Sequence, residues 1–186
     1  MRDHPHAKEL LAALEAHRPS DAAEARALDA IRAFVAREPQ CFRRELAVGH
    51  VTGSAWVLDP ERGHVLLTHH RKLDLWLQLG GHADGDSDLP RVALREAIEE
   101  SGIDSIVRMS DAVFDVDVHP IPAHGGERAH HHYDVRYLFE ADRRAPLRLS
   151  GESKDVAWVA LERVADIATD ASVLRMAAKS LALGRP

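Results

Sequence analysis

The sequence predicts an α/β fold of the α+β type, in which helices cover both faces of a mixed β-sheet. Two kinds of segment support this prediction. Apolar residues recur at three- and four-residue spacing near both ends of the chain, which is typical of amphipathic helices. Between these ends lie short segments rich in Val, Leu, Thr and Trp, as strands are. Because strands and helices alternate irregularly and include antiparallel hairpins, we expect a mixed sheet between helical layers.

Residues 1–44 are expected to form an N-terminal helical extension, and residues 45–186 the main domain. Pro19 separates two helical stretches, and Asp21 followed by Glu24 has the capping-box pattern that opens the second stretch. Apolar stripes at helical spacing generally indicate packing. We therefore expect these helices either to cover a face of the sheet or to form the contact of a homodimer.

Within the main domain, the sequence predicts five strands, a short apolar segment and two helices. The strands lie at about 50–58, 64–70, 111–119, 130–140 and 156–161, the apolar segment at 76–79, and the helices at about 89–101 and 170–183. Residues 59–63 form a turn between the first two strands, and residues 82–88 form a polar loop before the first helix.

Composition and charge exclude several classes of protein. The 186 residues carry a formal net charge of −6, whereas a protein that binds nucleic acid polymers normally presents a basic patch. A small anionic substrate is compatible with this charge, because a bound divalent cation reverses the local field. No apolar run is long enough for a membrane span or a secretory signal, and Cys41 is the only cysteine. We therefore expect a cytoplasmic protein without a disulfide or a membrane partner.

Three glutamates on the helix that ends near Ser101 are the most informative feature. At about 100° per residue, Glu96, Glu99 and Glu100 share one arc of the helix. Glu96 and Glu100 repel each other by about 0.2–0.5 kcal/mol, and the helix dipole disfavours anions in the last turn by about 0.3–1 kcal/mol. A hard divalent cation such as Mg²⁺, which prefers oxygen ligands, would relieve this crowding. The alternative is a solvated acidic face, the more common meaning of three glutamates taken alone.

The segment from Gly81 to Ile103 resembles the Nudix box, whose pattern is Gly, five residues, Glu, seven residues, then Arg-Glu-U-x-Glu-Glu-x-Gly-U, where U is a bulky aliphatic residue. The matching positions are Gly81, Arg95, Glu96, Glu99, Glu100, Gly102 and Ile103. Ser87 stands where the pattern has its first glutamate, with Asp86 and Asp88 on either side, and this departure affects the support of the loop and of Arg95. The chain is thus identified, by resemblance, as a member of the Nudix hydrolase family. The resemblance implies an α/β/α sandwich, preceded here by the N-terminal helices.

The resemblance also implies a metal cofactor and a reaction. Mg²⁺ or Mn²⁺ is expected to bind Glu96, Glu99, Glu100 and the carbonyl of Gly80, while Arg95 orients a box carboxylate. Water would attack a phosphorus of a nucleoside diphosphate linked to another group, with Glu96 or Glu99 assisting the water. Such ions neutralise the diphosphate, lower the pKa of a bound water and align nucleophile with leaving group.

A general base outside the box is a further expectation of the resemblance, since it often lies in a loop before a late strand. Glu152 occupies such a loop, ahead of the strand predicted at 156–161. We name Glu152 as the candidate, and the alternative is a solvated loop acid.

Two later strands carry polar side chains at alternate positions. Phe114, Val116 and Val118 are expected to face one way on the first strand, opposite Asp115, Asp117 and His119. On the second strand the polar residues are His130, His132, Asp134 and Arg136. Paired as a hairpin, these strands would present a wall for substrate phosphates, a sugar or a second metal, with Arg136 as the best phosphate contact. The alternative is the solvated outer face of an antiparallel sheet.

Two details of this wall stay open in the sequence. The spacing of His130 and His132 permits zinc binding, but the sequence fixes no third and fourth ligand. Trp76, shortly before the box, is expected to line the core or the substrate pocket, where a base could stack on it.

Three hypotheses for function follow. The first is a hydrolase of a nucleoside diphosphate derivative, such as a nucleotide sugar or dinucleotide. The second is a catalytically weak Nudix module that senses a nucleotide or metabolite, and Ser87 favours it. The third, a prenyl diphosphate isomerase on the same fold, typically needs a catalytic cysteine, and Cys41 lies outside the expected catalytic core.

Overall fold

The computed structural model describes residues 5–123, 128–151 and 153–184. The helices in these ranges are α1 (Pro5–Ala16), α2 (Ala22–Arg37), α3 (Leu89–Ser101) and α4 (Ala171–Leu183), with a 3₁₀ helix η1 (Leu161–Asp166). The strands are β1 (Gly49–Leu58), β2 (His64–His70), β3 (Trp76–Leu77), β4 (Leu79–His82), β5 (Val107–Ile121), β6 (His130–Glu140) and β7 (Ser153–Ala160). None of these helices is long and apolar enough to span a membrane.

Strand β1 lies at the centre of one mixed sheet. Its neighbours follow the order β3-β2-β1-β6-β5, and β4 also pairs with β1 while β7 pairs with β2. The β1–β6 pair is parallel and the other pairs are antiparallel, so the predicted mixed sheet is confirmed. Every residue of β1 is buried, because the strand is covered on both faces.

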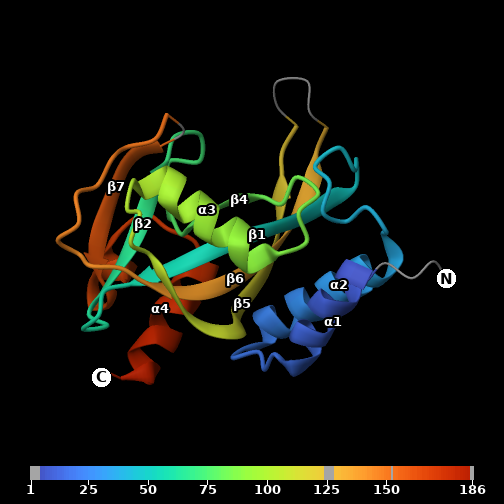
Figure 1. Ribbon diagram of the computed structural model, residues 1–186, viewed down its shortest axis with the longest axis horizontal. Helices are drawn as coiled ribbons and strands as arrows, with labels where there is room; N and C mark the ends of the chain where they lie inside the picture. The colour runs from blue at the N-terminus through green and yellow to red at the C-terminus, as the bar shows by residue number, and fades with distance from the viewer. Residues whose placement is uncertain (1–4, 124–127, 152, 185–186) are drawn as a thin grey trace.

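The helices cover both faces of the sheet, as predicted. Residues of α1, α2 and α3 share one hydrophobic cluster with the odd-numbered side chains of β1, such as Val51 and Val57. On the opposite face, α4 and η1 pack on the even-numbered Trp56 and Leu58. Figure 1 shows α3 lying across β1, with the α1–α2 pair beside β5.

Several element boundaries differ from the prediction. Strand β4 continues through His82, where the sequence predicted a loop, and β5 begins at Val107 rather than near 111. A bulge in β5 shifts its register between Val113 and Asp115. The prediction that Phe114 faces the same way as Val116 was therefore wrong. Val113 joins Val116 in one cluster, while Phe114 packs into the other.

The N-terminal helices are part of the hydrophobic core. Phe34 of α2 stacks on Tyr133 of β6, with ring centroids 3.8 Å apart and an interplanar angle of 4°. Of the two alternatives for these helices, covering a sheet face is what the structure shows. Cys41, just after α2, is fully buried, and burial raises the pKa of its thiol to about 12, so this cysteine has a packing role. The division at residue 44 and the homodimer stay predictions.

A buried carboxylate joins the N-terminal helices to the rest of the molecule. Glu24 of α2 accepts hydrogen bonds from His17 Nε2 at 2.8 Å and from Lys179 Nζ of α4 at 2.7 Å. The backbone N–H and the hydroxyl of Ser20 also donate to it. Burial alone would raise the pKa of Glu24, but these hydrogen bonds outweigh it and hold the pKa well below the ordinary value of 4.5.

We expect Glu24→Gln to lower the free energy of unfolding by about 3 kcal/mol at pH 7, because one partner of a buried ionic network is removed. A carboxyl group with a lowered pKa in the folded state stabilises the fold above its unfolded pKa and loses this effect in acid. The difference between wild type and variant should therefore shrink as the pH falls below about 4.5. Urea unfolding across this pH range measures it. Glu15→Gln, at an exposed position of α1, is the control, and an equal loss in both variants would contradict the assigned role.

Candidate functional site

Helix α3 is fixed at both ends by local interactions. The side chain of Asp88 accepts a hydrogen bond from the backbone N–H of Arg91 at 3.2 Å, and Pro90 occupies the first turn. At the other end Gly102 adopts a left-handed conformation, with φ of 72°, and its N–H donates to the carbonyl of Ile98. The predicted caps are confirmed, and they fix where α3 begins and ends.

Two box glutamates lie against the paired glycines of β4. The backbone N–H of Gly80 donates to Glu100 Oε2 at 2.9 Å. A Cβ atom on Gly81 would lie only 2.4 Å from Glu96 Oε2, so the missing side chain is what lets this carboxylate approach the strand. Glu99, on the same arc of the helix, is exposed. Glu96 and Glu100 therefore lie beside β4, and the convergence of all three carboxylates on one metal site stays a prediction.

Arg95 holds one of these carboxylates. Its Nη2 donates to Glu96 Oε1 at 2.6 Å and to the carbonyl of His82 at 3.0 Å. The hydrogen bond to Glu96 raises the pKa of the Arg95 guanidinium. The contact expected for Arg95 is thus present, and it is made without a glutamate at position 87.

The loop around Ser87 has its own ion pairs. Asp86 accepts a hydrogen bond from Arg91 Nη2 at 2.8 Å, and Asp88 lies 3.5 Å from Arg91 Nε. The two aspartates that flank Ser87 therefore contact Arg91, and the carbonyl of His82 supports Arg95.

The donors at this helix suit a partly hydrated Mg²⁺ ion. Glu96, Glu99, Glu100 and the Gly80 carbonyl would offer only oxygen, which hard cations prefer, and the missing Cβ of Gly81 lets the Glu96 carboxylate lie close to the strand. In the described ranges, the three glutamates do not bring three ligand atoms within 4.8 Å of one another. Mg²⁺ does not require such convergence, because it usually keeps several waters and takes one or two carboxylates.

The polar wall predicted on β5 and β6 exists, but its centre is buried. Arg136 is 1% exposed, and its guanidinium donates to Asp134 at 2.7 Å and to Asp115 at 3.1 Å. Asp134 also accepts hydrogen bonds from Thr52 and Ser54 of β1. The structure therefore gives Arg136 and Asp134 partners inside the protein, and their contact with substrate stays a prediction.

Helix α4 completes this buried network, because it covers the face of the sheet on which Asp115, Asp134 and Arg136 lie. Arg175 donates to both oxygens of Asp115, at 2.9 and 2.8 Å, and Lys179 donates to it at 3.0 Å. Sequence reasoning missed both cations, since it predicted the closing helix without assigning a role to any of its side chains. The available signal was a basic residue at positions 175 and 179, one helical turn apart, within an otherwise apolar stretch.

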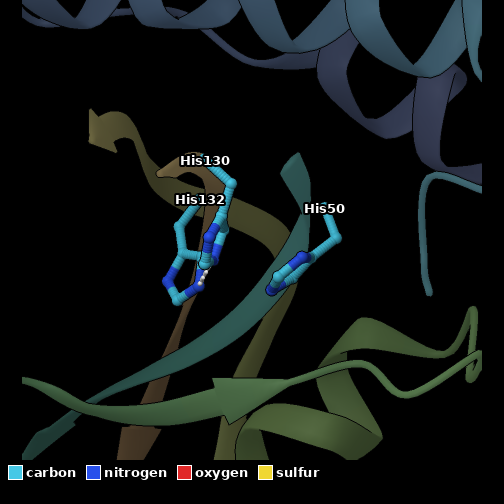
Figure 2. Close-up of side chains that lie close together, drawn as sticks. All are labelled: His50, His130 and His132. Carbon is cyan, nitrogen blue, oxygen red and sulfur yellow. Dashed lines mark hydrogen bonds between the residues drawn. The ribbon is translucent and has the colours of Figure 1, made fainter. Parts of the chain in front are cut away.

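Beyond Asp134, the same face of the sheet carries a cluster of histidines. Figure 2 shows His50 of β1 and His130 and His132 of β6 with their rings directed toward one another. His82 and His119 lie beside His132, with ring centroids 5.1 and 5.4 Å away. We refer to these five residues as the histidine cluster.

Burial makes the histidine cluster electrically neutral at its centre. Burial, together with the neighbouring His82 and His130, lowers the pKa of His50 to about 4. Burial and the neighbouring histidines, His119 foremost among them, lower the pKa of His132 to about 2. Both rings therefore carry no charge at neutral pH. The sequence drew attention to His130 and His132, while His50 and His82 were missed because they lie on other strands.

Two predicted residues lie away from these groups. Trp76 is half-buried, and its ring stacks on His69 with centroids 5.0 Å apart and an interplanar angle of 12°. Its role at the substrate stays a prediction. Glu152, the candidate general base, lies outside the described residues.

The fold and the acidic helix together define a class of protein, an α/β/α sandwich whose helix carboxylates suit metal-assisted hydrolysis. Comparison with known proteins gives the family. A family model described as the NUDIX domain matches residues 49–177, which is more than half of the chain. The chain therefore belongs to the Nudix family, and its general activity is the hydrolysis of a pyrophosphate bond.

Solved structures agree with this fold. A binary complex of the C. elegans Ap4A hydrolase has a TM-score of 0.57 and 21% identity, and the match covers 72% of this chain and 96% of that one. The MutT NUDIX hydrolase from Burkholderia pseudomallei has a TM-score of 0.53 and 21% identity, covering 70% and 97%. The NUDIX domain of Shewanella oneidensis NrtR, complexed with ADP ribose, has a TM-score of 0.51 and 16% identity, covering 81% and 96%. No curated protein matches the sequence.

We expect Gly81→Ala to weaken Mn²⁺ binding by at least about tenfold, because the new methyl group would displace the Glu96 carboxylate. Electron paramagnetic resonance of free Mn²⁺ measures the affinity. Gly63→Ala is the matched control, since a Cβ there meets nothing within 4 Å. Equal Mn²⁺ affinity in the two variants would show that the position of Glu96 does not matter to the ion.

Proposed function

We propose that the chain hydrolyses a diphosphate bond in a nucleoside diphosphate linked to another moiety, such as a nucleotide sugar or a dinucleotide, with Mg²⁺ or Mn²⁺ as cofactor. The observation that carries this proposal is the placement of Glu96 and Glu100 against Gly81 and Gly80, with Glu99 exposed beside them. Two similar structures support the substrate class. One is named an Ap4A hydrolase, and the other holds ADP ribose, a nucleoside diphosphate linked to a sugar.

Each box residue has a defined part in this proposal. A bound divalent ion would neutralise the diphosphate and lower the pKa of a coordinated water. Glu96, Glu99, Glu100 and the Gly80 carbonyl supply oxygen ligands. Arg95 keeps the Glu96 carboxylate in place through its 2.6 Å hydrogen bond.

The proton of the attacking water requires a base. Glu96 or Glu99 serves this role from within the box, and Glu152 is our candidate from outside it. A carboxylate is suited to the task when it lies within hydrogen-bond reach of the water.

The substrate is proposed to lie along the histidine cluster and Trp76. His130, His132 and Trp76 are half-buried, so a ligand can reach them. Arg136 and Asp134 lie behind this surface and support it through their mutual hydrogen bond.

Replacing one ligand carboxylate tests the metal site. We expect Glu99→Gln and Glu100→Gln each to lower kcat by about 100-fold or more with little effect on thermal stability, since loss of a metal-oriented electrostatic contact costs at least that much. The rates are measured as phosphate release at saturating Mg²⁺, and melting temperatures are compared by circular dichroism. Glu61→Gln, at an exposed turn position, is the control. Wild-type turnover in both box variants would show that the metal site is assigned wrongly.

A sensor of nucleotides is the second candidate, and the observation in its favour is Ser87 in place of the box glutamate. A panel of nucleotide sugars, dinucleotides and nucleoside triphosphates separates the two candidates. Turnover of one compound class with Mg²⁺ or Mn²⁺ supports the enzyme. Tight binding without turnover supports the sensor.

A further inference from the structure

We propose that His50, His130 and His132 form a second metal site, separate from the box glutamates, for a late first-row divalent ion of which Zn²⁺ is the reference. In the described ranges, these residues offer three ligand nitrogens that all lie within 4.8 Å of one another. Imidazole nitrogen suits zinc, copper, nickel and cobalt, whereas the oxygens of the box suit magnesium and manganese. This proposal does not depend on the proposed hydrolysis.

The spacing of two ligand atoms already matches a metal centre. His130 Nε2 and His132 Nε2 lie 3.4 Å apart. Two imidazoles on a tetrahedral Zn²⁺ with Zn–N bonds of 2.0–2.1 Å are separated by about 3.3–3.4 Å. An ion can therefore be bound by both rings while their separation stays as it is.

The ring of His130 is held with its Nε2 lone pair toward the cluster. Its Nδ1 lies 2.8 Å from the carbonyl of Arg128. A carbonyl oxygen only accepts hydrogen bonds, so Nδ1 must carry the proton for this hydrogen bond to form. In a neutral imidazole with Nδ1 protonated, Nε2 carries the lone pair. A backbone carbonyl on the second nitrogen is the usual arrangement behind a histidine that binds a metal.

His50 supplies an independent indication that a ligand belongs here. Its side chain is buried, with an exposed fraction of 2%, yet neither ring nitrogen has a hydrogen-bond partner among the residues that the structure describes. Burying a polar group without a partner is unfavourable, and such groups in native proteins usually have a structural explanation. A metal ion between His50, His130 and His132 would satisfy one of these nitrogens.

The sheet brings the ligands together. His50 of β1 pairs with His132 of the parallel strand β6, and His119 of β5 pairs with His132 from the other side. His82 of β4 lies 5.0 Å from His50 between ring centroids. Three imidazoles form the core of the site, and a water, His82 or His119 can complete a tetrahedral shell.

The proposal is tested by metal uptake of the full-length chain, with any affinity tag removed and endogenous metal stripped by a chelator. We expect wild type to retain one Zn²⁺ per chain after gel filtration, measured by inductively coupled plasma mass spectrometry. Co²⁺ should give the intense visible d–d absorption of a tetrahedral site. Zn²⁺ should also raise the melting temperature, since it binds only the folded chain.

Variants at half-buried positions avoid disturbing the core. His130→Asn and His132→Asn should each weaken Zn²⁺ binding by about 100-fold or more and abolish the Co²⁺ band. His131→Asn is the matched control, because His131 is the exposed residue between them, and its side chain faces the other side of the strand. Circular dichroism verifies that all three variants are folded.

The outcomes separate this site from the box. Glu99→Gln should keep the stoichiometric Zn²⁺ and the Co²⁺ band, whatever its rate of hydrolysis. The proposal is overturned if wild type retains no Zn²⁺, if His131→Asn weakens binding as much as His132→Asn, or if Glu99→Gln removes the ion.

Discussion

The parallel pairing of β1 with β6 is the constraint on which the rest of the structure depends. Its register sets His50 beside His132 and Thr52 beside Asp134. Side chains alternate between the two faces of a strand, so a slip of one residue would move every polar group of β1 to the face covered by α3. Because β1 is buried along its whole length, that slip would also place apolar side chains among buried charges. The hydrophobic pattern and the polar wall therefore enforce the same register.

Negative charge is handled differently on the two faces of the sheet. Asp115 is fully buried, and it has Arg136, Arg175 and Lys179 as close partners. A buried carboxylate must be compensated inside the protein, because water cannot solvate it. The glutamates of α3 lie nearer the surface, where solvent screens their repulsion and Glu99 is exposed. This difference is consistent with our proposal that the glutamates of α3 bind an external cation.

The parts of the molecule that depend on neighbouring residues were predictable from the sequence. The caps of α3 at Asp88 and Gly102 and the common arc of its glutamates all follow from residues within a few positions of one another. The full set of partners of Asp115 was not predictable, since Arg175 lies on a helix at the far end of the chain from that strand. His50 was missed for the same reason, because strand pairing is set by the whole sheet rather than by spacing along one strand. The bulge at Phe114 adds one residue that no alternation pattern reveals.

Consecutive residues of strand β4 contact the box glutamates on one side and the histidine cluster on the other. Gly81 faces α3 and lies against Glu96, whereas His82 faces the histidine cluster on the other side. The carbonyl of His82 also accepts the hydrogen bond of Arg95, which holds Glu96. A displacement of this short strand would therefore change the positions of the box glutamates and of the histidine cluster together. Since oxygen and nitrogen donors prefer different ions, the two proposed sites would compete little for magnesium and zinc, while their geometries would stay coupled through one backbone.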